Sequence, residues 1–454
     1  MELIRISPEI TRWMEDLVCE RASPELALQF VPGVGWELTV VGSSRRVVLT
    51  SNPVRYERLA VTLPPHAARW DPRAEGWEAP LDEALLLPGV ADIAHPVITM
   101  GPDGARITFD LFWFALWALS RGEEAANTER DTHNRFPVHA SHAFQQGYLD
   151  RPLVDEWFAL LREVVQRTWP ALPLVHPKFS VAVSHDVDEP HFLEGIGFYA
   201  IVRRSAGDIL RRHAYVRGLS APFRWLLHRI GVPGMDPYNQ FAWMMQQAEA
   251  RGLRSTFHFL CGNTDARYDR SYRLSDPYLR TLLASIHARG HAIGLHPSYG
   301  SCYNAGVIQR EAKELRRHCT DLGIPLPRLT NRMHYLRWAT PETPRALAAA
   351  GIFSDCTLGY AELPGFRCST CFEYSAFDPT TNNRLSLRIQ PLVAMDVSLL
   401  SNRYLNLGYV AACARLTMLK RKCRAVGGCF TLCWHNSELD TPVKRRIFQS
   451  ILDT

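Results

Sequence analysis

Val181-Ala-Val-Ser-His-Asp-Val-Asp-Glu-Pro190 joins a short run of small and β-branched residues to two carboxylates, Asp186 and Asp188. The run over residues 179–184 predicts a short buried strand. Because residues two apart on a strand share a face, both carboxylates should point the same way from its carboxyl end. Two adjacent carboxylates can divide the work, one staying ionised on a metal while the other titrates as a base. Taken alone, the stretch fits a strand that ends at a capping Asp equally well.

Further strands are expected downstream of this one. A helical pattern closes on Gly, the expected left-handed cap, and a short apolar run follows, as at Gly252 before residues 253–260. Strands that alternate with helices indicate a parallel sheet. Strands near residues 180, 256, 293, 331, 354, 390 and 431 predict an α/β fold with an irregular seven-stranded (β/α) barrel, which places chemistry at the carboxyl ends of its strands. Those ends carry Asp186, Asp188, His258, His296, Arg332, His334, Asp355, Asp396 and His435.

The barrel is expected to occupy residues 173–454, after a smaller α+β N-terminal domain of unknown role at residues 1–172. At 454 residues the chain exceeds the size at which one core keeps growing, and its 46% hydrophobic content suffices for two cores. Residues 170–177, rich in Pro, are interpreted as the linker. The apolar residues 111–119 are too few to span a bilayer and predict a buried helix.

Composition narrows the class of protein. The formal net charge of +5 is too small for this length to favour nucleic acid as a partner. The first ten residues lack the apolar core of a signal peptide, and no stretch has the length of a membrane helix, so we expect a cytoplasmic protein. Eleven scattered cysteines indicate reduced thiols, and the pair Cys368 and Cys371, without a second such pair, is interpreted as structural.

The order and spacing of the polar residues resemble those of the polysaccharide deacetylase (NodB-homology) family from about residue 178 to the end. The resemblance covers four motifs: Ser184-His-Asp-Val-Asp188, Gly290-His-Ala-Ile-Gly-Leu-His-Pro-Ser-Tyr299, Arg332-Met-His-Tyr335 and Phe430-Thr-Leu-Cys-Trp-His435. Asn134-Arg-Phe-Pro137 and Leu153-Val-Asp-Glu-Trp157 also look like the domain that precedes a cytosolic branch of this family, found with bacterial surface-polysaccharide genes.

The resemblance implies a role for each matching residue. Asp186 would be the catalytic base and Arg332 its brace, while the backbone near Tyr335 would help to hold the oxyanion and His435 would be the general acid. Asp188 and His296 would be metal ligands. The implied cofactor is a divalent metal ion, first of all zinc, with cobalt or nickel as alternatives.

The second motif departs from the family pattern, which has two histidines four residues apart. Four residues beyond His296 the chain has Gly300. His291 is a poor substitute, since five residues of strand separate it from His296 by roughly 16 Å and place it on the opposite face. His334 ends the neighbouring expected strand, so we predict that it is the third metal ligand. A buried structural histidine is the alternative, and His185 and His258 are interpreted as core residues or as supports of the ligands.

Three further residues, Arg367, Asp396 and Trp434, are predicted to bind substrate. Arg367 would clasp a carboxylate or phosphate, although a structural ion pair is a competing interpretation. The insert at residues 191–235 carries seven arginines among apolar residues: Arg203, Arg204, Arg211, Arg212, Arg217, Arg224 and Arg229. Such a segment suits peripheral contact with a membrane surface or an anionic sugar carrier, and equally a solvated basic helix.

These inferences predict a metal-dependent hydrolase that removes an N-acyl group, first of all acetyl, from an amino sugar or lipid-linked saccharide in surface-polysaccharide synthesis. One rival is a deformylase or other amide hydrolase on the same fold. Another is a metal-free protein that uses the barrel to hold a saccharide or a partner protein, which the missing histidine at position 300 would explain.

Overall fold

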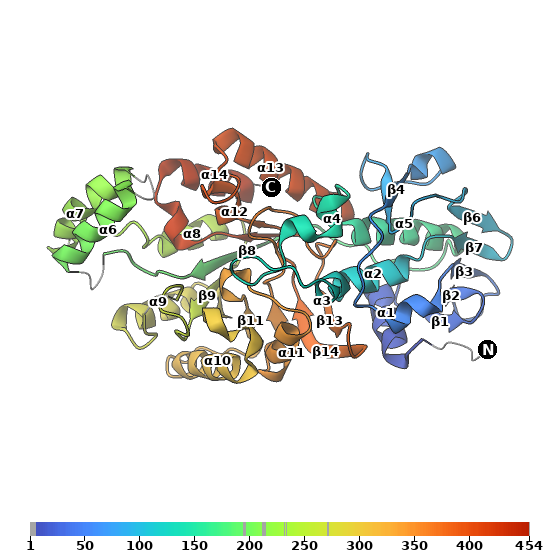
Figure 1. The fold of residues 1–454 in the computed structure, drawn as a ribbon, viewed down its shortest axis with the longest axis horizontal. Helices are drawn as coiled ribbons and strands as arrows, with labels where there is room; N and C mark the ends of the chain where they lie inside the picture. The colour runs from blue at the N-terminus through green and yellow to red at the C-terminus, as the bar shows by residue number, and fades with distance from the viewer. Residues whose placement is uncertain are drawn as a thin grey trace.

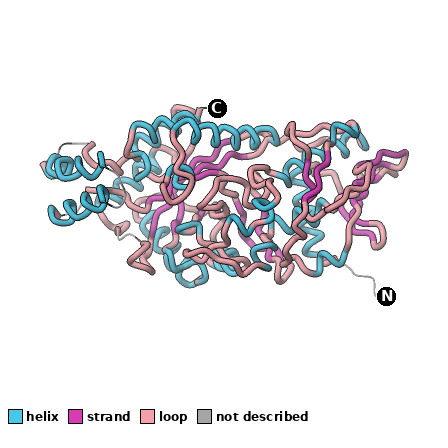
Figure 2. The backbone as a smooth tube through the Cα atoms, turned by 45° about the horizontal axis from the view of Figure 1, so that its top comes forward, coloured by secondary structure: helices cyan, strands magenta, loops and turns pink. Residues whose placement is uncertain are grey.

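The structure is a computed structural model that describes residues 6–193, 197–210, 215–230, 232, 234–269 and 272–453. The body is elongated, with the N-terminal region at one end, a large sheet in the middle and a pair of helices, α6 (Phe198–Leu210) and α7 (Tyr215–Arg229), at the other end (Figure 1). Helices lie outside the central strands, as the tube view shows (Figure 2).

The N-terminal region holds a five-stranded sheet in the order β1-β2-β3-β7-β6 and a two-stranded sheet, β4-β5. Its elements are α1 (Pro8–Arg21), β1 (Ala27–Val31), β2 (Gly35–Thr39), β3 (Arg46–Leu49), η1 (Pro53–Glu57), β4 (Ala67–Trp70), η2 (Pro72–Glu75), β5 (Leu85–Pro88), β6 (Ile98–Gly101), β7 (Gly104–Ile107), α2 (Leu111–Leu119), α3 (Gly122–Ala126), η3 (Val138–Ala140), α4 (His142–Gln145) and α5 (Leu153–Thr168). All nine residues of α2 are buried, as the apolar run predicted, and Asp110 caps the helix by accepting a hydrogen bond from the Trp113 N–H.

A nine-stranded sheet fills the middle, in the order β13-β14-β12-β11-β10-β9-β8-β16-β15. Its strands are β8 (Ser180–Val187), β9 (Ser255–Leu260), β10 (Ala292–His296), β11 (Thr330–Asn331), β12 (Ser354–Asp355), β13 (Tyr374–Asp378), β14 (Asn383–Ile389), β15 (Ala394–Met395) and β16 (Cys429–Cys433). The helices between and after them are α8 (Phe241–Glu249), α9 (Pro277–Ala288), η4 (Tyr299–Tyr303), α10 (Ala305–Thr320), η5 (His334–Leu336), α11 (Glu342–Ala349), α12 (Asp396–Leu400), α13 (Tyr409–Val426), η6 (Asn436–Leu439) and α14 (Pro442–Leu452).

The mixed α/β class predicted from the sequence is correct, and the number of strands is not. Strands lie at or beside all seven expected places, and every pairing among them is parallel. The sheet gains β13, which pairs antiparallel with β14 as a hairpin, and β15, whose two residues are too short to show a periodic pattern. Over the described residues the pairing runs from β13 to β15 in a line, so a closed barrel stays a prediction.

The N-terminal region and the large sheet share one continuous cluster of buried hydrophobic side chains. The Trp13 indole N–H donates to the Ser375 carbonyl at 2.9 Å, which ties α1 to β13. Buried Asp155 of α5 accepts from Arg21 and from the backbone N–H of Cys371. The two regions are therefore packed together, and Cys371, with a pKa raised well above normal by burial, belongs to this packing. Across the described residues, every helix falls short of the length and apolar character that crossing a membrane requires.

Candidate active site

The polar residues predicted from the strand ends gather at one edge of the large sheet. Strands β16, β8, β9, β10 and β11 are neighbours in that order, so their carboxyl ends meet. Asp186 lies opposite His258 in the register of β8 and β9, and His296 ends β10. Asp188 follows β8, His334 begins η5 and His435 follows β16, so residues far apart in sequence share one site.

Asp188, His296 and His334 form a group that can hold a metal ion. Their ligand atoms all lie within 4.8 Å of one another. Oδ1 of Asp188 is 3.1 Å from Nε2 of His296 and 3.7 Å from Nε2 of His334. Ligands that bind a tetrahedral metal at 2.0–2.2 Å are separated by roughly 3.4 Å, so these donors have the spacing that a divalent ion requires.

Both imidazoles are oriented through their second nitrogen. His296 donates its Nδ1–H to the Arg332 carbonyl at 2.6 Å, and His334 donates its Nδ1–H to the Asp269 carboxylate at 2.9 Å. With Nδ1 engaged in this way, the neutral ring would offer Nε2, the nitrogen that faces Asp188, to a metal. Oδ1 of Asp188 is buried and has no well-aligned hydrogen bond within the described chain, so the residues present fit a metal.

Asp186 lies beside this group, and its own partners are Arg332 and His258. Its Oδ1 lies 3.0 Å from the Arg332 guanidinium and 3.4 Å from Nδ1 of His258. Burial by itself would raise the pKa of Asp186, yet Arg332 and the nearby histidines hold that pKa well below its usual range. Burial lowers the pKa of His258 to about 4, so this ring is neutral and supports the carboxylate. Asp186 is thus ionised and ready to accept a proton.

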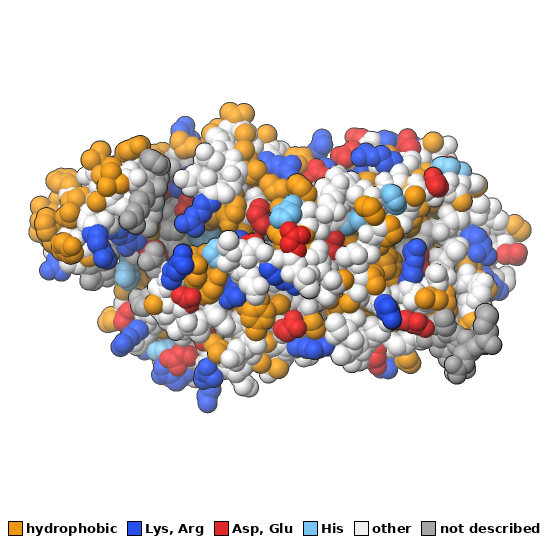
Figure 3. All heavy atoms as spheres, in the orientation of Figure 1, with side chains coloured by type: hydrophobic (Ala, Val, Ile, Leu, Met, Phe, Trp, Pro, Cys, Tyr) orange, Lys and Arg blue, Asp and Glu red, His pale blue; other side chains and the backbone are white. Residues whose placement is uncertain are grey.

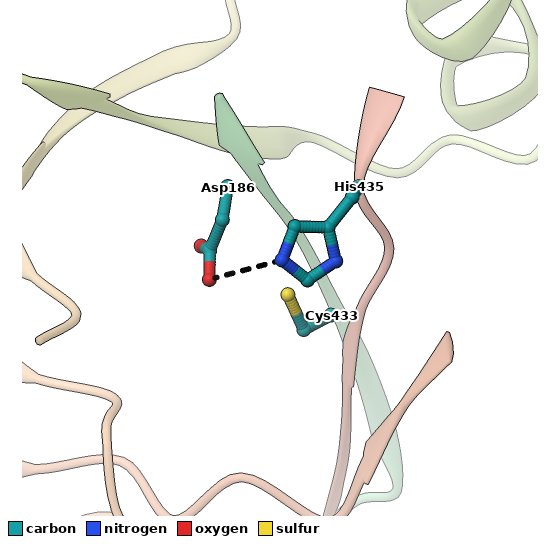
Figure 4. Close-up of side chains that lie close together, drawn as sticks. All are labelled: Asp186, Cys433 and His435. Atoms are coloured by element: carbon teal, nitrogen blue, oxygen red, sulfur yellow. Dashed lines mark ion pairs between the residues drawn. The ribbon is translucent and has the colours of Figure 1, made fainter. Parts of the chain in front are cut away.

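His435 completes the site from the end of β16. Its Nε2 faces Asp186 (Figure 4) and lies 4.0 Å from Oδ2 of that residue. The same nitrogen is 3.8 Å from Oδ2 of Asp188. Its Nδ1–H donates to Asp396 at 2.8 Å, and its backbone N–H donates to the same carboxylate at 2.6 Å. Burial opposes the charged form of His435, but Asp396, with Asp188 and Asp186, raises its pKa to about 10. At neutral pH the ring carries a proton that it can give away.

Asp186, Cys433 and His435 also lie close enough together to suggest a metal (Figure 4). Burial raises the pKa of the Cys433 thiol well above normal, so the thiol keeps its proton. Asp186 is engaged by Arg332, and His435 is protonated through Asp396. A metal needs deprotonated ligands, so this group would have to lose the protons of both Cys433 and His435, whereas the group around Asp188 would have to lose only that of His334, whose pKa Asp188 and Asp269 raise to about 9 against the effect of burial.

Tyr335 stands where the resemblance places an oxyanion contact. Its backbone is left-handed, with φ of 61° and ψ of 16°, a conformation that a residue with a side chain adopts only when its surroundings hold it. Arg135 from the N-terminal region donates to the Tyr335 carbonyl at 2.9 Å. The motif at residues 134–137 therefore reaches the site, a contact that the sequence did not predict.

Four half-buried aromatic rings pack on one another, and one of them, Tyr335, contacts His334. Tyr268 and Tyr299 stack with centroids 4.2 Å apart, and His133 and Tyr335 lie 4.7 Å apart. Tyr299 and Tyr335 meet edge to face. Together these rings form an aromatic wall, defined here as His133, Tyr268, Tyr299 and Tyr335.

Position 300 holds no ligand, as the sequence indicated. The Gly300 N–H donates to Oγ1 of Thr264 at 2.7 Å, and a Cβ at this glycine would lie 2.9 Å from the same oxygen. His291 is held in the core by the Ser255 N–H and by Glu249, so it takes no part. His185 donates from Nδ1 to the Trp434 carbonyl at 2.7 Å and is a buried structural residue.

The three residues predicted to bind substrate each have partners within the protein. Arg367 is 3% exposed, and its guanidinium forms a two-pronged ion pair with Glu124. Trp434 is fully buried and packs edge to face on Phe448. Asp396 is also fully buried, and it orients His435. Arg367 thus forms the structural ion pair that the sequence also allowed, and Asp396 orients His435, while contact of these three residues with substrate stays a prediction.

The signature of a domain family of unknown function, DUF7033, matches residues 77–170. No curated protein is significantly similar to the chain. Similar solved structures include one assigned as a polysaccharide deacetylase from Mycobacterium smegmatis, with 14% identity, a TM-score of 0.38 and coverage of 61% of this chain and 82% of that one. A Puue allantoinase and a protein assigned as a polysaccharide deacetylase from Pseudomonas aeruginosa PAO1 each show 13% identity, cover 61% of this chain and 84% of their own, and give TM-scores of 0.38 and 0.37.

Proposed function

We propose that the chain is a metal-dependent amide hydrolase that removes an N-acyl group, first of all acetyl, from an amino sugar in surface-polysaccharide synthesis. The observation that carries the proposal is the convergence of Asp188 Oδ1 with Nε2 of His296 and His334, each imidazole fixed by a hydrogen bond at Nδ1. The four motifs that resemble the deacetylase family supply the reaction class.

The residues beside the ligands are suited to amide hydrolysis. A divalent ion held by Asp188, His296 and His334 would polarise the amide carbonyl and acidify a water molecule. Asp186, kept ionised by Arg332, accepts the proton of the attacking water. The left-handed backbone at Tyr335 lies next to His334 and would help to stabilise the oxyanion.

The leaving nitrogen needs a proton before the carbon–nitrogen bond breaks. His435 holds that proton at Nε2, which faces Asp186 and Asp188, and Asp396 holds the ring in place from behind. The base and the acid thus sit on neighbouring strands and keep opposite charges at neutral pH. Environments that drive two titrating groups apart in pKa mark an acid and base pair.

The aromatic wall supports a saccharide as the substrate class. Binding pockets are commonly lined by aromatic side chains with a few polar groups that fix orientation. The wall meets His334 through Tyr335, with the two ring centroids 4.7 Å apart, and the sugar attached to the reacting amide would lie along it.

The test joins a metal assay to product analysis. Purified protein should contain or take up about one zinc, cobalt or nickel ion per chain, and should release acetate from N-acetylated amino sugars, supplied as nucleotide-linked and lipid-linked forms. Release of formate from N-formyl sugars instead would identify the deformylase. His296→Ala serves as the metal-deficient control. Saccharide binding with neither metal nor turnover would overturn the proposal and favour the metal-free binding protein.

A further inference from the structure

Helices α6 and α7 form a hairpin whose outward side is apolar. Exposed residues of α7 and its end recur every three or four positions, the spacing of one helix face. They are Val216, Leu219, Phe223, Leu226 and Ile230. Val216 is 82% exposed and Leu219 is 73% exposed. A stripe of this kind normally faces a protein core, and here it faces outward.

Helix α6 also exposes apolar side chains. Tyr199, Val202 and Leu210 are exposed, whereas the buried residues of this helix are Ile201, Ser205 and Asp208. Ten of the 19 exposed large hydrophobic side chains in the described chain belong to this hairpin, namely Phe198, Tyr199, Val202, Leu210, Tyr215, Val216, Leu219, Phe223, Leu226 and Ile230. The space-filling view shows this apolar surface at the end of the body opposite the N-terminal region (Figure 3).

Positive charge accompanies the apolar surface. The insert holds seven arginines and only two acids, Glu194 and Asp208, and Asp208 is fully buried. Arg203 and Arg229 are exposed, and Arg224 is half-buried. Arg211, Arg212 and Glu194 lie outside the described residues, as does the side chain of Arg217. The described surface of the hairpin is therefore apolar and cationic, and blue side chains border the orange ones in Figure 3.

We propose that the hairpin α6–α7 docks on an anionic lipid bilayer, with its apolar stripe at the boundary between headgroups and acyl chains. Apolar and aromatic residues on one face, with arginines beside them, are the composition of helices that lie in this interface. Anionic lipids attract such a surface through its arginines. Both helices are too short to span a bilayer, so the hairpin lies on the membrane.

The hairpin contacts the segment that follows β8, the strand that carries Asp186. Arg204 of α6 forms an ion pair with Glu189, the neighbour of Asp188, and its guanidinium stacks 4.1 Å from the Phe192 ring. The Asn436 amide donates to the Glu189 carbonyl at 2.8 Å, beside His435. Docking would thus hold the site near the bilayer surface, where a lipid-linked saccharide lies. This consequence rests on the proposed function, whereas the docking does not.

Vesicle flotation of the full chain tests the docking. The wild type should float with vesicles of phosphatidylcholine and phosphatidylglycerol and bind phosphatidylcholine vesicles at least about tenfold more weakly, with binding that falls as salt increases. Leu219→Asp with Phe223→Asp should weaken binding to the anionic vesicles by about tenfold or more, because two inserted side chains become charged. Val410→Asp, at a residue of α13 that is 78% exposed, is the matched control and should bind as the wild type does.

A second variant separates charge from apolar contact. Arg203→Glu with Arg229→Glu leaves the apolar stripe intact and should remove the preference for phosphatidylglycerol. Failure of the wild type to bind either vesicle, or equal binding by the wild type and the Leu219/Phe223 variant, would overturn the proposal. Concentration-dependent self-association that the Leu219/Phe223 variant abolishes, without vesicle binding, would overturn it in favour of a second copy as the partner. Deacetylation of a soluble sugar should be unchanged in these variants, so loss of docking and failure of the proposed function are distinguishable.

Discussion

Asp269 accepts a hydrogen bond from His334, with its Oδ1 2.9 Å from Nδ1 of that imidazole. The bond turns Nε2 of His334 toward Asp188, 3.7 Å away. Asp269 itself is held by the backbone N–H groups of Thr264, Asp265 and Tyr299. Asp269, which its own loop holds in place, therefore orients the imidazole of His334, the third predicted metal ligand.

His334→Ala should lose metal about as completely as His296→Ala, and excess zinc or cobalt should restore part of it. The reason is that two ligands without the third bind a divalent ion weakly. Metal content after dialysis against a competing chelator measures the effect. Normal metal in His334→Ala together with loss in His296→Ala would show that the third ligand lies elsewhere.

Asp269→Asn should weaken metal binding by about 10- to 100-fold, the usual effect of removing the group that orients a metal-bound histidine. The matched control is Asp265→Asn in the same loop, since the Asp265 side chain accepts from the backbone N–H of Arg267 instead. Dissociation constants from competition titrations compare the two. Equal affinities would leave Asp269 with a purely structural role in its loop.

Asp186→Asn should keep its metal and its thermal stability while losing turnover by about 10²- to 10⁴-fold, because Asp186 is assigned as the base and Asp188 as the ligand. Metal analysis and turnover on the same preparation provide the measurement. Loss of metal with the loss of turnover would move Asp186 into the ligand set.

The sequence predicted the part of the site that strand ends supply. His296, His334 and His435 follow short apolar runs, and parallel strands bring such positions together whatever lies between them. Asp269 and Arg135 were missed because each sits in a loop, where no period in the sequence places a side chain. The sequence predicted a basic insert with apolar residues but not that the apolar face of α7 is exposed, because a helical period shows that one face is apolar and leaves open whether that face is covered.

The ion-pair partner of Arg367 could not be predicted from the sequence. That partner, Glu124, lies 243 positions earlier in the chain, so only the fold reveals the pair.

Arg367, with Arg121, overcomes the effect of burial and lowers the pKa of Glu124 to about 2. Glu124→Gln should lower the free energy of unfolding by about 3 to 5 kcal/mol, because it leaves a buried guanidinium without its counter-charge. Denaturant titration should show a much smaller effect for Glu314→Gln, which breaks an exposed pair with Arg317.

The metal-free protein should lose stability as the pH rises through the alkaline range. Burial disfavours the charged form of His334, but Asp188 and Asp269 raise its pKa to about 9, and the pKa of His435 is about 10. Both folded-state values exceed the unfolded value of about 6.5. The contribution to stability is therefore complete below about pH 6.5 and disappears as the pH passes through about 9 and 10.

Thermal unfolding of chelator-treated protein between about pH 6 and pH 10 measures this dependence. His334→Gln should flatten the lower part of the decline, since glutamine does not titrate. Metal uptake should release a proton near neutral pH, because the ion displaces the proton of His334. A melting temperature independent of pH in the chelator-treated wild type would contradict the raised pKa values.

His435→Ala should lower kcat by about 10²- to 10⁴-fold with little change in KM, because a general acid acts in the transition state and contributes little to binding. Asp396→Asn should cause a smaller loss, since His435 keeps its position in the chain but loses the carboxylate that holds Nδ1 and favours the charged ring. Kinetics on an N-acetylated amino sugar provide these values.

A substrate with a different leaving group tests most directly whether His435 is the general acid. An acetate ester of an acidic phenol departs without needing a proton, whereas an amine must be protonated as it leaves. His435→Ala should therefore approach wild-type rates on the aryl ester while remaining slow on the amide, and Asp186→Asn should be slow on both because the attacking water still needs a base. An equal loss by His435→Ala on ester and amide would remove His435 from the role of acid and assign it to holding Asp186 and Asp188, which its Nε2 approaches within 4.0 Å.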